Sequence, residues 1–283
     1  FQEELISSRL SNAITFFEPS IATIDQLLLF HTADYINYVS KKSSNGHGYL
    51  DGGDTPAFKG VMEASSYVVG TTLSAIDLVM ANDVSRAFIP IAGLHHAGRD
   101  YASGFCVFND CGVAIEYLRE QYNIKKIAYV DIDAHHGDGV FYAFEKDPNL
   151  IFADIHEDGN YLYPGTGSIE EIGKGLGKGA KINIPIAPGS NDKVFMDAWN
   201  KIVNFIDEKS PEFIIMQCGA DCLSGDPLTH LELTEEIHAI VARDLCMLAD
   251  KHCDGKIIGA GGGGYDLNNV ARAWTRVVQE FLR

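Results

Sequence analysis

Six short apolar runs, separated by longer amphipathic segments, constrain the fold of this chain more than any other feature of its sequence. The runs are rich in β-branched and aromatic residues and mostly continuous, which is typical of strands covered on both faces. They lie at 86–91, 126–132, 150–155, 180–186, 213–218 and 256–259. Helical periodicity is found at about 57–80, 109–122, 192–208, 234–252 and 267–282. This alternation predicts one α/β domain over residues 1–283, with a mainly parallel sheet flanked by helices.

Gly- and Ser-rich pieces at 41–56 and 172–180 are predicted to be loops. The chain carries 39 acidic and 22 basic residues, a formal net charge of −17, so we expect no direct binding to nucleic acid. A cationic substrate is compatible with that charge. No apolar stretch reaches membrane-spanning length without a charge, so no membrane partner is expected.

The six cysteines form no Cys-x-x-Cys pair, which indicates reduced thiols in a cytoplasmic protein, with the nucleus left open as a location. The sequence begins at Phe1 without a signal-peptide pattern, which indicates a processed or trimmed chain. It gives no basis for an oligomeric state.

Polar, chemically active residues directly follow most of the predicted strands. "AGLHH" follows 86–91, "DAHHGD" follows 126–132, "GADCLSGD" follows 213–218 and "AGGGGYD" follows 256–259. Because the carboxyl ends of parallel strands share one edge of a sheet, these loops should converge there. The expected site therefore includes His95, His96, Asp133, His135, Asp221 and Tyr265.

Asp133 and His135 are two residues apart after a strand, so both can face one ion. Asp221 can supply a third ligand, and one imidazole with two carboxylates makes an open zinc site. Two carboxylates neutralise a dication, so a separate general base is needed, for which His95 and His96 are the candidates. Their expected carboxylate partners are Asp131 and Asp138, although the spacing does not decide which histidine pairs with which aspartate.

Five motifs together resemble the zinc-dependent histone deacetylase superfamily, which also contains acetoin-utilisation proteins and acetylpolyamine amidohydrolases. They are "GLHHAGRDYASGFCVFND" (93–110), "DIDAHHGDG" (131–139), "YPGTG" (163–167), "QCGADCLSGDPL" (217–228) and "GGGGYDLNNVARAW" (261–274). They occur in the family's order, and the similarity covers roughly 45–280. The resemblance implies an arginase-like α/β fold, a central, mainly parallel eight-stranded sheet and hydrolysis of an N-acyl amide to acetate and a free amine.

The resemblance also implies roles for individual residues. Zinc, one ion per chain, would be bound by Asp133, His135 and Asp221. The tandem proton-transfer pair would be His95, backed by Asp131, and His96, backed by Asp138 and acting as the main base and acid. Tyr265 would donate its hydroxyl to the substrate carbonyl and then to the developing oxyanion.

Further residues are implied to bind substrate and a second cation. Gly104, Phe105 and Tyr163 would line a narrow tunnel for the acyl-lysine chain, although the family most often has Phe at the position of Tyr163. Asp54 matches a rim aspartate that holds the substrate backbone, and Leu228 is the candidate gatekeeper. A structural K⁺ is implied near Asp131, Asp133 and His135, where Asp154 takes the place of a hydroxyl residue. The N-terminus departs from the family pattern and keeps only Arg9 of it.

Three alternatives stay open at this stage. An arginase relative would hold two Mn²⁺ ions, but "DAHHGD" has one residue more than the arginase motif. A non-catalytic acyl-lysine reader would need no turnover, yet every implied catalytic group is present. Among deacetylases, the substrate could be acylated lysine in peptides or proteins, or an acylated polyamine, and the apolar Leu228 mildly favours lysine.

Overall fold

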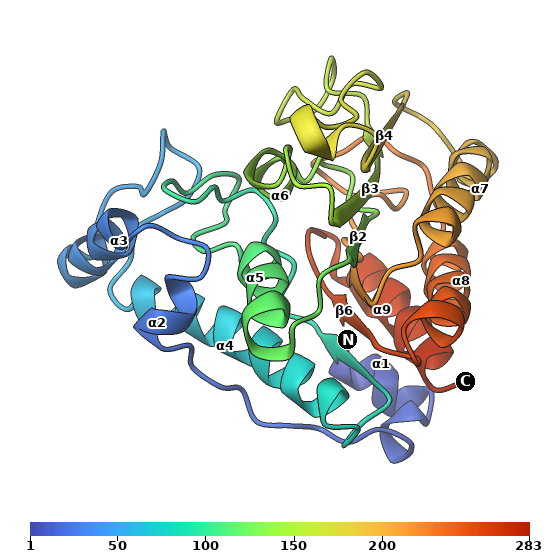
Figure 1. The fold of residues 1–283 in the computed structure, drawn as a ribbon, viewed down its shortest axis with the longest axis horizontal. Coiled ribbons are helices and arrows are strands. Elements are labelled where there is room, and N and C mark those ends of the chain that lie inside the picture. The colour runs from blue at the N-terminus through green and yellow to red at the C-terminus, as the bar shows by residue number, and fades with distance from the viewer.

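A six-stranded sheet runs through the centre of the computed structural model, which describes residues 1–283 (Figure 1). The strands are β1 (Arg86–Ile89), β2 (Ile127–Asp131), β3 (Leu150–Glu157), β4 (Lys181–Ile186), β5 (Phe213–Gln217) and β6 (Ile257–Ala260). Their order is β1-β6-β5-β2-β3-β4, and every neighbouring pair is parallel. Each strand overlaps one of the six apolar runs, so the α/β architecture is confirmed.

The sheet has six strands rather than the eight that the resemblance implies. Residues before β1 contain helices and, at 14–23, a segment with no regular secondary structure. That segment directs its hydrogen bonds to a helix and not to a strand, since Ala22 N donates to Ser66 O and Ser20 N donates to Thr71 Oγ1. The edge strand β1 therefore gains no further ladder partner from the residues before it.

Nine α-helices surround the sheet. They are α1 (Gln2–Ser7), α2 (Ile24–Leu27), α3 (Ala33–Asn45), α4 (Val61–Met80), α5 (Asp110–Tyr122), α6 (Asp138–Ala143), α7 (Asp192–Lys209), α8 (Glu236–His252) and α9 (Leu267–Phe281). Short 3₁₀ turns occur at Leu10–Asn12 and Gly175–Gly177. The five predicted helical segments correspond to α4, α5, α7, α8 and α9.

Helix α3 corrects the predicted loop at 41–56, because its last turn includes Lys41 to Asn45. The Thr32 side chain caps its first turn by accepting from Tyr35 N. Buried Ile36 and Val39 form an apolar face just before the segment whose Lys and Ser content indicated a loop, and buried Ser43 continues that face into it. Tertiary packing of that face therefore overrides the weak local preference.

The sheet separates two apolar layers, and alternate residues of each strand contribute to opposite ones. On β2, Ile127 and Tyr129 join the layer under α4 and α5, whereas Ala128 and Val130 join the layer under α7, α8 and α9. Figure 1 shows these two groups of helices on the two sides of the strands. Burial on both faces explains why the strands read as continuous apolar runs rather than as alternating patterns.

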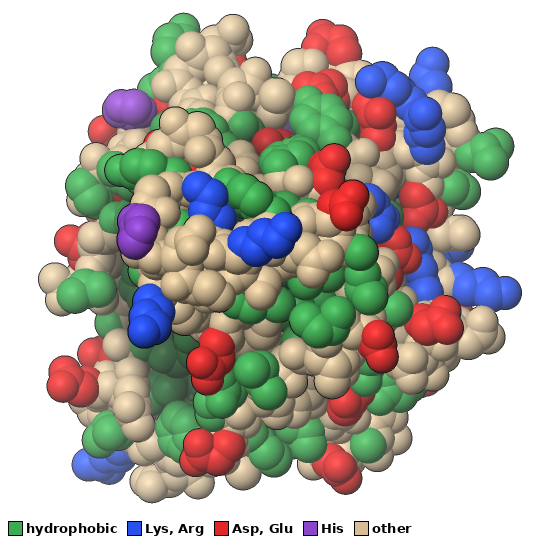
Figure 2. Space-filling view, turned by 90° about the vertical axis from the view of Figure 1, so that its left-hand side faces the viewer, with side chains coloured by type: hydrophobic (Ala, Val, Ile, Leu, Met, Phe, Trp, Pro, Cys, Tyr) green, Lys and Arg blue, Asp and Glu red, His purple; other side chains and the backbone are tan.

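No helix of this chain combines the length and the apolarity needed to cross a membrane. Acidic and basic side chains are interspersed over the face seen in Figure 2, without one large basic patch there.

Candidate functional site

The carboxyl ends of the neighbouring strands β2 and β5 bring together the three predicted metal ligands. Asp133 and His135 follow β2, and Asp221 follows β5. His135 Nδ1 lies 3.0 Å from Asp133 Oδ1 and 3.0 Å from Asp221 Oδ2. Ligand atoms from all three residues lie within 4.8 Å of one another. The strand order reverses between β2 and β5, which is where open parallel sheets build their sites.

This group carries an excess of buried negative charge that a cation would balance. Burial opposes protonation of His135, but hydrogen bonds with Asp133 and Asp221 outweigh it and raise the pKa of His135 to about 11. Burial and the charge of Asp133 raise the pKa of Asp221 to about 7. A dication would replace the proton on His135, and one nitrogen with two carboxylate oxygens is a donor set that zinc accepts. The three residues therefore fit a metal ion.

Residues that the sequence reasoning missed hold these carboxylates in place. Gln217 Nε2 donates to Asp133 Oδ2 at 2.9 Å, and Gly263 N donates to the same oxygen at 2.8 Å. A Cβ at Gly263 would collide with the Asp221 carboxylate, so the glycine loop after β6 serves close approach to the ligands. Gln217 could have been noticed as a polar residue in the otherwise apolar run at 213–218.

The two adjacent histidines lie beside the metal group, and each has a different carboxylate partner. His95 Nδ1 lies 2.8 Å from Asp131 Oδ2, and His96 Nδ1 lies 2.7 Å from Asp138 Oδ1. The two Nε2 atoms are 3.1 Å apart. With a carboxylate at each Nδ1, the two Nε2 atoms face each other at hydrogen-bond distance. This is the pairing that the resemblance implies.

The surroundings of the two histidines push their pKa values in opposite directions. Burial alone would lower the pKa of His95, but Asp131 and Asp133 outweigh burial and raise it to about 10. Burial and the neighbouring charge of His95 lower the pKa of His96, and its bond with Asp138 does not compensate. At neutral pH these shifts favour an imidazolium at His95 and a neutral imidazole at His96.

Buried side chains outside the predicted set fix the histidine segment. The fully buried Asp110, at the start of α5, accepts from Gly93 N and Leu94 N at 2.8–3.1 Å. Asn109 Nδ2 donates to His95 O at 3.2 Å, behind the imidazole pair. Tyr129 Oη donates to Asp131 Oδ2 at 2.6 Å, which orients that carboxylate toward His95. These contacts hold His95 and His96 in a fixed position in the structure.

Tyr265 lies at the exposed side of the site, 40% accessible, after the glycine loop. Its backbone N donates to Asp226 Oδ2 at 2.8 Å, which the sequence reasoning did not predict. Burial and the charges of Asp133 and Asp221 raise the pKa of its phenol above the ordinary value. The hydroxyl therefore stays protonated and is available as a donor.

The five residues predicted to contact substrate differ from one another in their neighbours and in their exposure to solvent. The Tyr163 ring centroid is 5.2 Å from that of His96, and the Phe105 ring centroid is 6.1 Å from that of Tyr265. Gly104 has φ +52°, and a Cβ there would collide with the His96 ring. Leu228 is half-exposed. Asp54 is exposed. Burial raises the pKa of Tyr163, and the charge of Asp54 adds a smaller contribution in the same direction.

Asp154, predicted near a K⁺ ion, is fully buried opposite Asp131 in the β2–β3 register. Its Oδ1 lies 2.7 Å from His156 Nδ1, and its Oδ2 accepts from Gly137 N at 2.9 Å. Burial opposes protonation of His156, but Asp154 outweighs it and raises the pKa of His156. A second cation at this point therefore stays a prediction.

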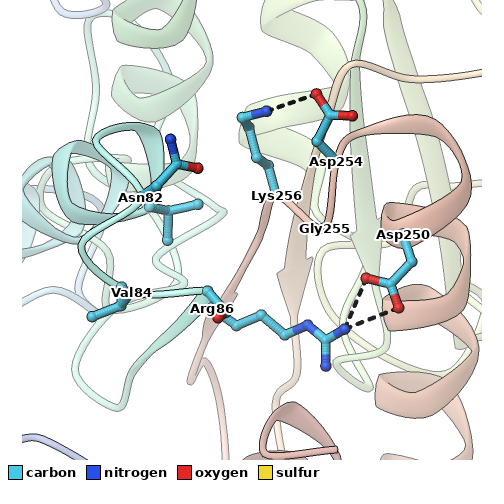
Figure 3. Close-up of a pocket in the computed structure, with 9 residues that line it drawn as sticks. Asn82, Val84, Arg86, Asp250, Asp254, Gly255 and Lys256 are labelled. Atoms are coloured by element: carbon cyan, nitrogen blue, oxygen red, sulfur yellow. Dashed lines mark hydrogen bonds and ion pairs between the residues drawn. The ribbon is translucent and has the colours of Figure 1, made fainter.

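A separate pocket of about 370 Å³ lies at the other end of the sheet, and none of the predicted site residues lines it. Its cations are already paired with acids, Arg86 with Asp250 and Lys256 with Asp254, as Figure 3 shows. The predicted metal ligands and the predicted proton-transfer residues thus lie at the carboxyl edge of the sheet, away from this pocket.

Comparison with known proteins agrees with this geometry. A family model described as "Histone deacetylase domain" matches residues 1–281. The chain belongs to the histone deacetylase family. It is 42% identical over 268 residues to the acetoin utilization protein AcuC of Bacillus subtilis (strain 168), covering 92% of this chain and 69% of that protein. The AcuC protein of Staphylococcus aureus (strain MSSA476) is 34% identical over 287 residues, covering 97% and 73%.

Membership of the histone deacetylase family confirms the predicted superfamily and indicates a hydrolase of the deacetylase type. The largely buried Asp133–His135–Asp221 group is a candidate site for the metal on which that family depends. Which metal is bound and which acylated substrate is used belong to the proposal that follows.

Proposed function

We propose that this chain is a zinc-dependent amidohydrolase that removes acetyl or longer acyl groups from lysine side chains of peptides or proteins. The observation that carries the proposal is the buried metal group beside two histidines, each backed by its own carboxylate. Asp133, His135 and Asp221 would hold the ion. Zinc supplies, when bound, a Lewis acid that polarises an amide carbonyl and acidifies water.

The residues around the ion have separable tasks in this proposal. His96 is neutral and accepts the proton of the attacking water at Nε2. His95, an imidazolium next to it, supplies positive charge where negative charge develops. Tyr265 donates its hydroxyl to the carbonyl oxygen as that oxygen becomes anionic. A protonated histidine then delivers a proton to the departing amine, and the products are a carboxylate and a free amine.

The residues at the exposed side of the site support an acyl-lysine substrate. The ring of Tyr163, beside His96, and that of Phe105, beside Tyr265, would flank the proposed path of a methylene chain. Leu228, the candidate gatekeeper, is apolar and gives a second ammonium group no partner at that position, which favours lysine over a polyamine. Asp54 would hold the backbone of a peptide substrate. A structural K⁺ near Asp131 and Asp154 is part of the same proposal.

A substrate panel tests the function directly. Acetyl-lysine peptides, longer acyl-lysine peptides and acetylated polyamines would be incubated with the zinc-loaded protein and, in parallel, with a chelator. We expect release of acid from acyl-lysine peptides that ceases on chelation and returns with zinc. Preferential turnover of polyamines would reassign the substrate, and no turnover with one zinc bound per chain would favour an acyl-lysine reader.

A further inference from the structure

A hydrogen bond between two hydroxyl groups joins two separate loops beside the site, and no task described above uses it. Tyr163 Oη lies 2.5 Å from Ser103 Oγ. Tyr163 follows β3, whereas Ser103 lies 60 residues earlier, between β1 and α5. A phenylalanine at position 163 would supply the same ring without this bond. The hydroxyl pair is therefore something that aromatic packing alone does not require.

At the Tyr163 end of this hydrogen bond, the aromatic ring packs against His96 and His135. The centroid of its ring is 5.2 Å from that of His96 and 6.4 Å from that of His135, with edge-to-face geometry in both contacts. Tyr163 is 41% exposed, so its ring contacts both the site and solvent. Movement of this ring would change the space directly above the proton-transfer pair.

The Ser103 end belongs to the tight turn that carries the second aromatic residue of the site. Ser103 N donates to Cys106 O at 3.2 Å, and Cys106 N donates to Ser103 O at 2.8 Å. Between them Gly104 and Phe105 both have positive φ, +52° and +67°. Positive φ is costly for phenylalanine, so this turn persists only where its surroundings hold it. The Phe105 side chain is 54% exposed, so its own packing contributes little to holding this turn in place.

We propose that Ser103 is a positioning residue that acts through Tyr163 to fix the separation between the Tyr163 ring and Phe105. The enzyme thereby selects a slender, unbranched methylene chain next to the acylated nitrogen. This inference rests on the proposed deacetylase function. The Ser103–Tyr163 hydrogen bond ties the loop after β3 to the turn at 103–106, so bulkier chains meet two rings that cannot move apart independently.

Two substrates measure this selection. One is a peptide with Nε-acetyl-lysine, and the other is the same peptide with N-acetylated 4-(aminomethyl)phenylalanine, whose ring replaces slender methylenes. The readout is the ratio of kcat/KM for the slender substrate to kcat/KM for the bulky one. It would be measured on the zinc-loaded wild type, Tyr163→Phe, Ser103→Ala and the double variant.

We expect each single change to lower the ratio about fivefold, the effect of losing one neutral hydrogen bond. The double variant should lower it no further, because both changes remove the same bond. Ser103→Thr keeps a hydroxyl and should retain most of the wild-type ratio. Tyr161→Phe is the matched control, since its hydroxyl is in the same loop, is exposed and makes no hydrogen bond, and the wild-type ratio is expected.

Effects that multiply in the double variant would overturn the proposal, because the two hydroxyls would then act independently. An unchanged ratio in Tyr163→Phe would overturn it as well, as would an equal loss of kcat for both substrates in Ser103→Ala. A zinc-loaded wild type that turns over neither peptide would overturn the deacetylase function itself, and the inference with it. Turnover by the wild type with a failed double-variant result would overturn the inference alone.

Discussion

His95 and His96 are adjacent in the sequence and chemically identical, yet their neighbours shift their pKa values in opposite directions. His95 is surrounded by Asp131 and Asp133, whereas His96 has one carboxylate partner, Asp138, and the positive charge of His95 beside it. Burial and the charge on His95 both lower the pKa of His96, which favours the neutral state that a base needs. A single histidine at this position would have to act both as the neutral base and as the fixed positive charge, although it has only one pKa.

Replacement of His96 tests this division at the scale of one residue. We expect His96→Ala to reduce kcat by about two orders of magnitude, because it removes the proton acceptor. Zinc content should stay near one ion per chain, because His96 is not one of the three ligand residues. Steady-state kinetics together with metal analysis would check this. A variant that turns over substrate at the wild-type rate would remove His96 from the mechanism.

At the scale of elements, the backbone of helix α6 directly contacts the backbone of the histidine segment, residues 95–97. Val140 N donates to His95 O at 3.2 Å, and a Cβ at Gly139 would lie 2.5 Å from both His95 O and Ala97 O. The same helix begins with Asp138, the partner of His96. Any displacement of α6 therefore moves the carboxylate and presses on the histidines together.

Gly139→Ala tests this contact. Alanine favours a helix, but the clash with backbone atoms should lower the free energy of unfolding by about 1–3 kcal/mol and reduce kcat. Ala143→Gly, at the other end of α6, is the control: it weakens the helix without touching the histidine segment, so kcat should be retained. Urea unfolding and steady-state kinetics measure both. Greater stability with full activity in Gly139→Ala would show that the helix can shift freely.

The secondary-structure elements and the candidate site could be predicted from the sequence to different degrees, for physical reasons. The strands were found because burial on both faces leaves continuous apolar runs. Asp133 and His135 could be proposed as ligands because they directly follow such a run. The assignment of Asp131 to His95 and Asp138 to His96 was left open by spacing, since it depends on how β2 and α6 pack. Helix α3 was missed because its apolar face is diluted by Lys and Ser.

At the scale of the whole molecule, buried neutral histidines make stability depend on pH. His31 is buried, and its Nε2 accepts from Asn109 N at 3.0 Å. Burial lowers its pKa from 6.5 to about 4, and burial does the same for His238. Between these pH values the unfolded chain binds more protons than the folded chain. The contribution of these two histidines to stability is therefore fully present above pH 6.5 and is lost as the pH falls toward 4.

His31→Gln should reduce this dependence. For a pKa of 4 in the folded state and 6.5 in the unfolded state, His31 contributes about 1 kcal/mol to the loss of stability between pH 7.5 and 5.5. Urea unfolding at both pH values should show a smaller difference in the variant by about that amount. His47→Gln, which changes an exposed histidine, should keep the wild-type difference. An unchanged difference in His31→Gln would contradict the assignment.

The ligands of the proposed ion come from two adjacent strands, yet Asp221 lies 86 residues beyond His135. During synthesis, the first two ligands leave the ribosome long before the third exists. The β5 strand must then insert beside β2 before a closed set of donors forms. The proposed ion would therefore be captured firmly only after most of the chain has been made, so its loading would be a late event coupled to completion of the fold.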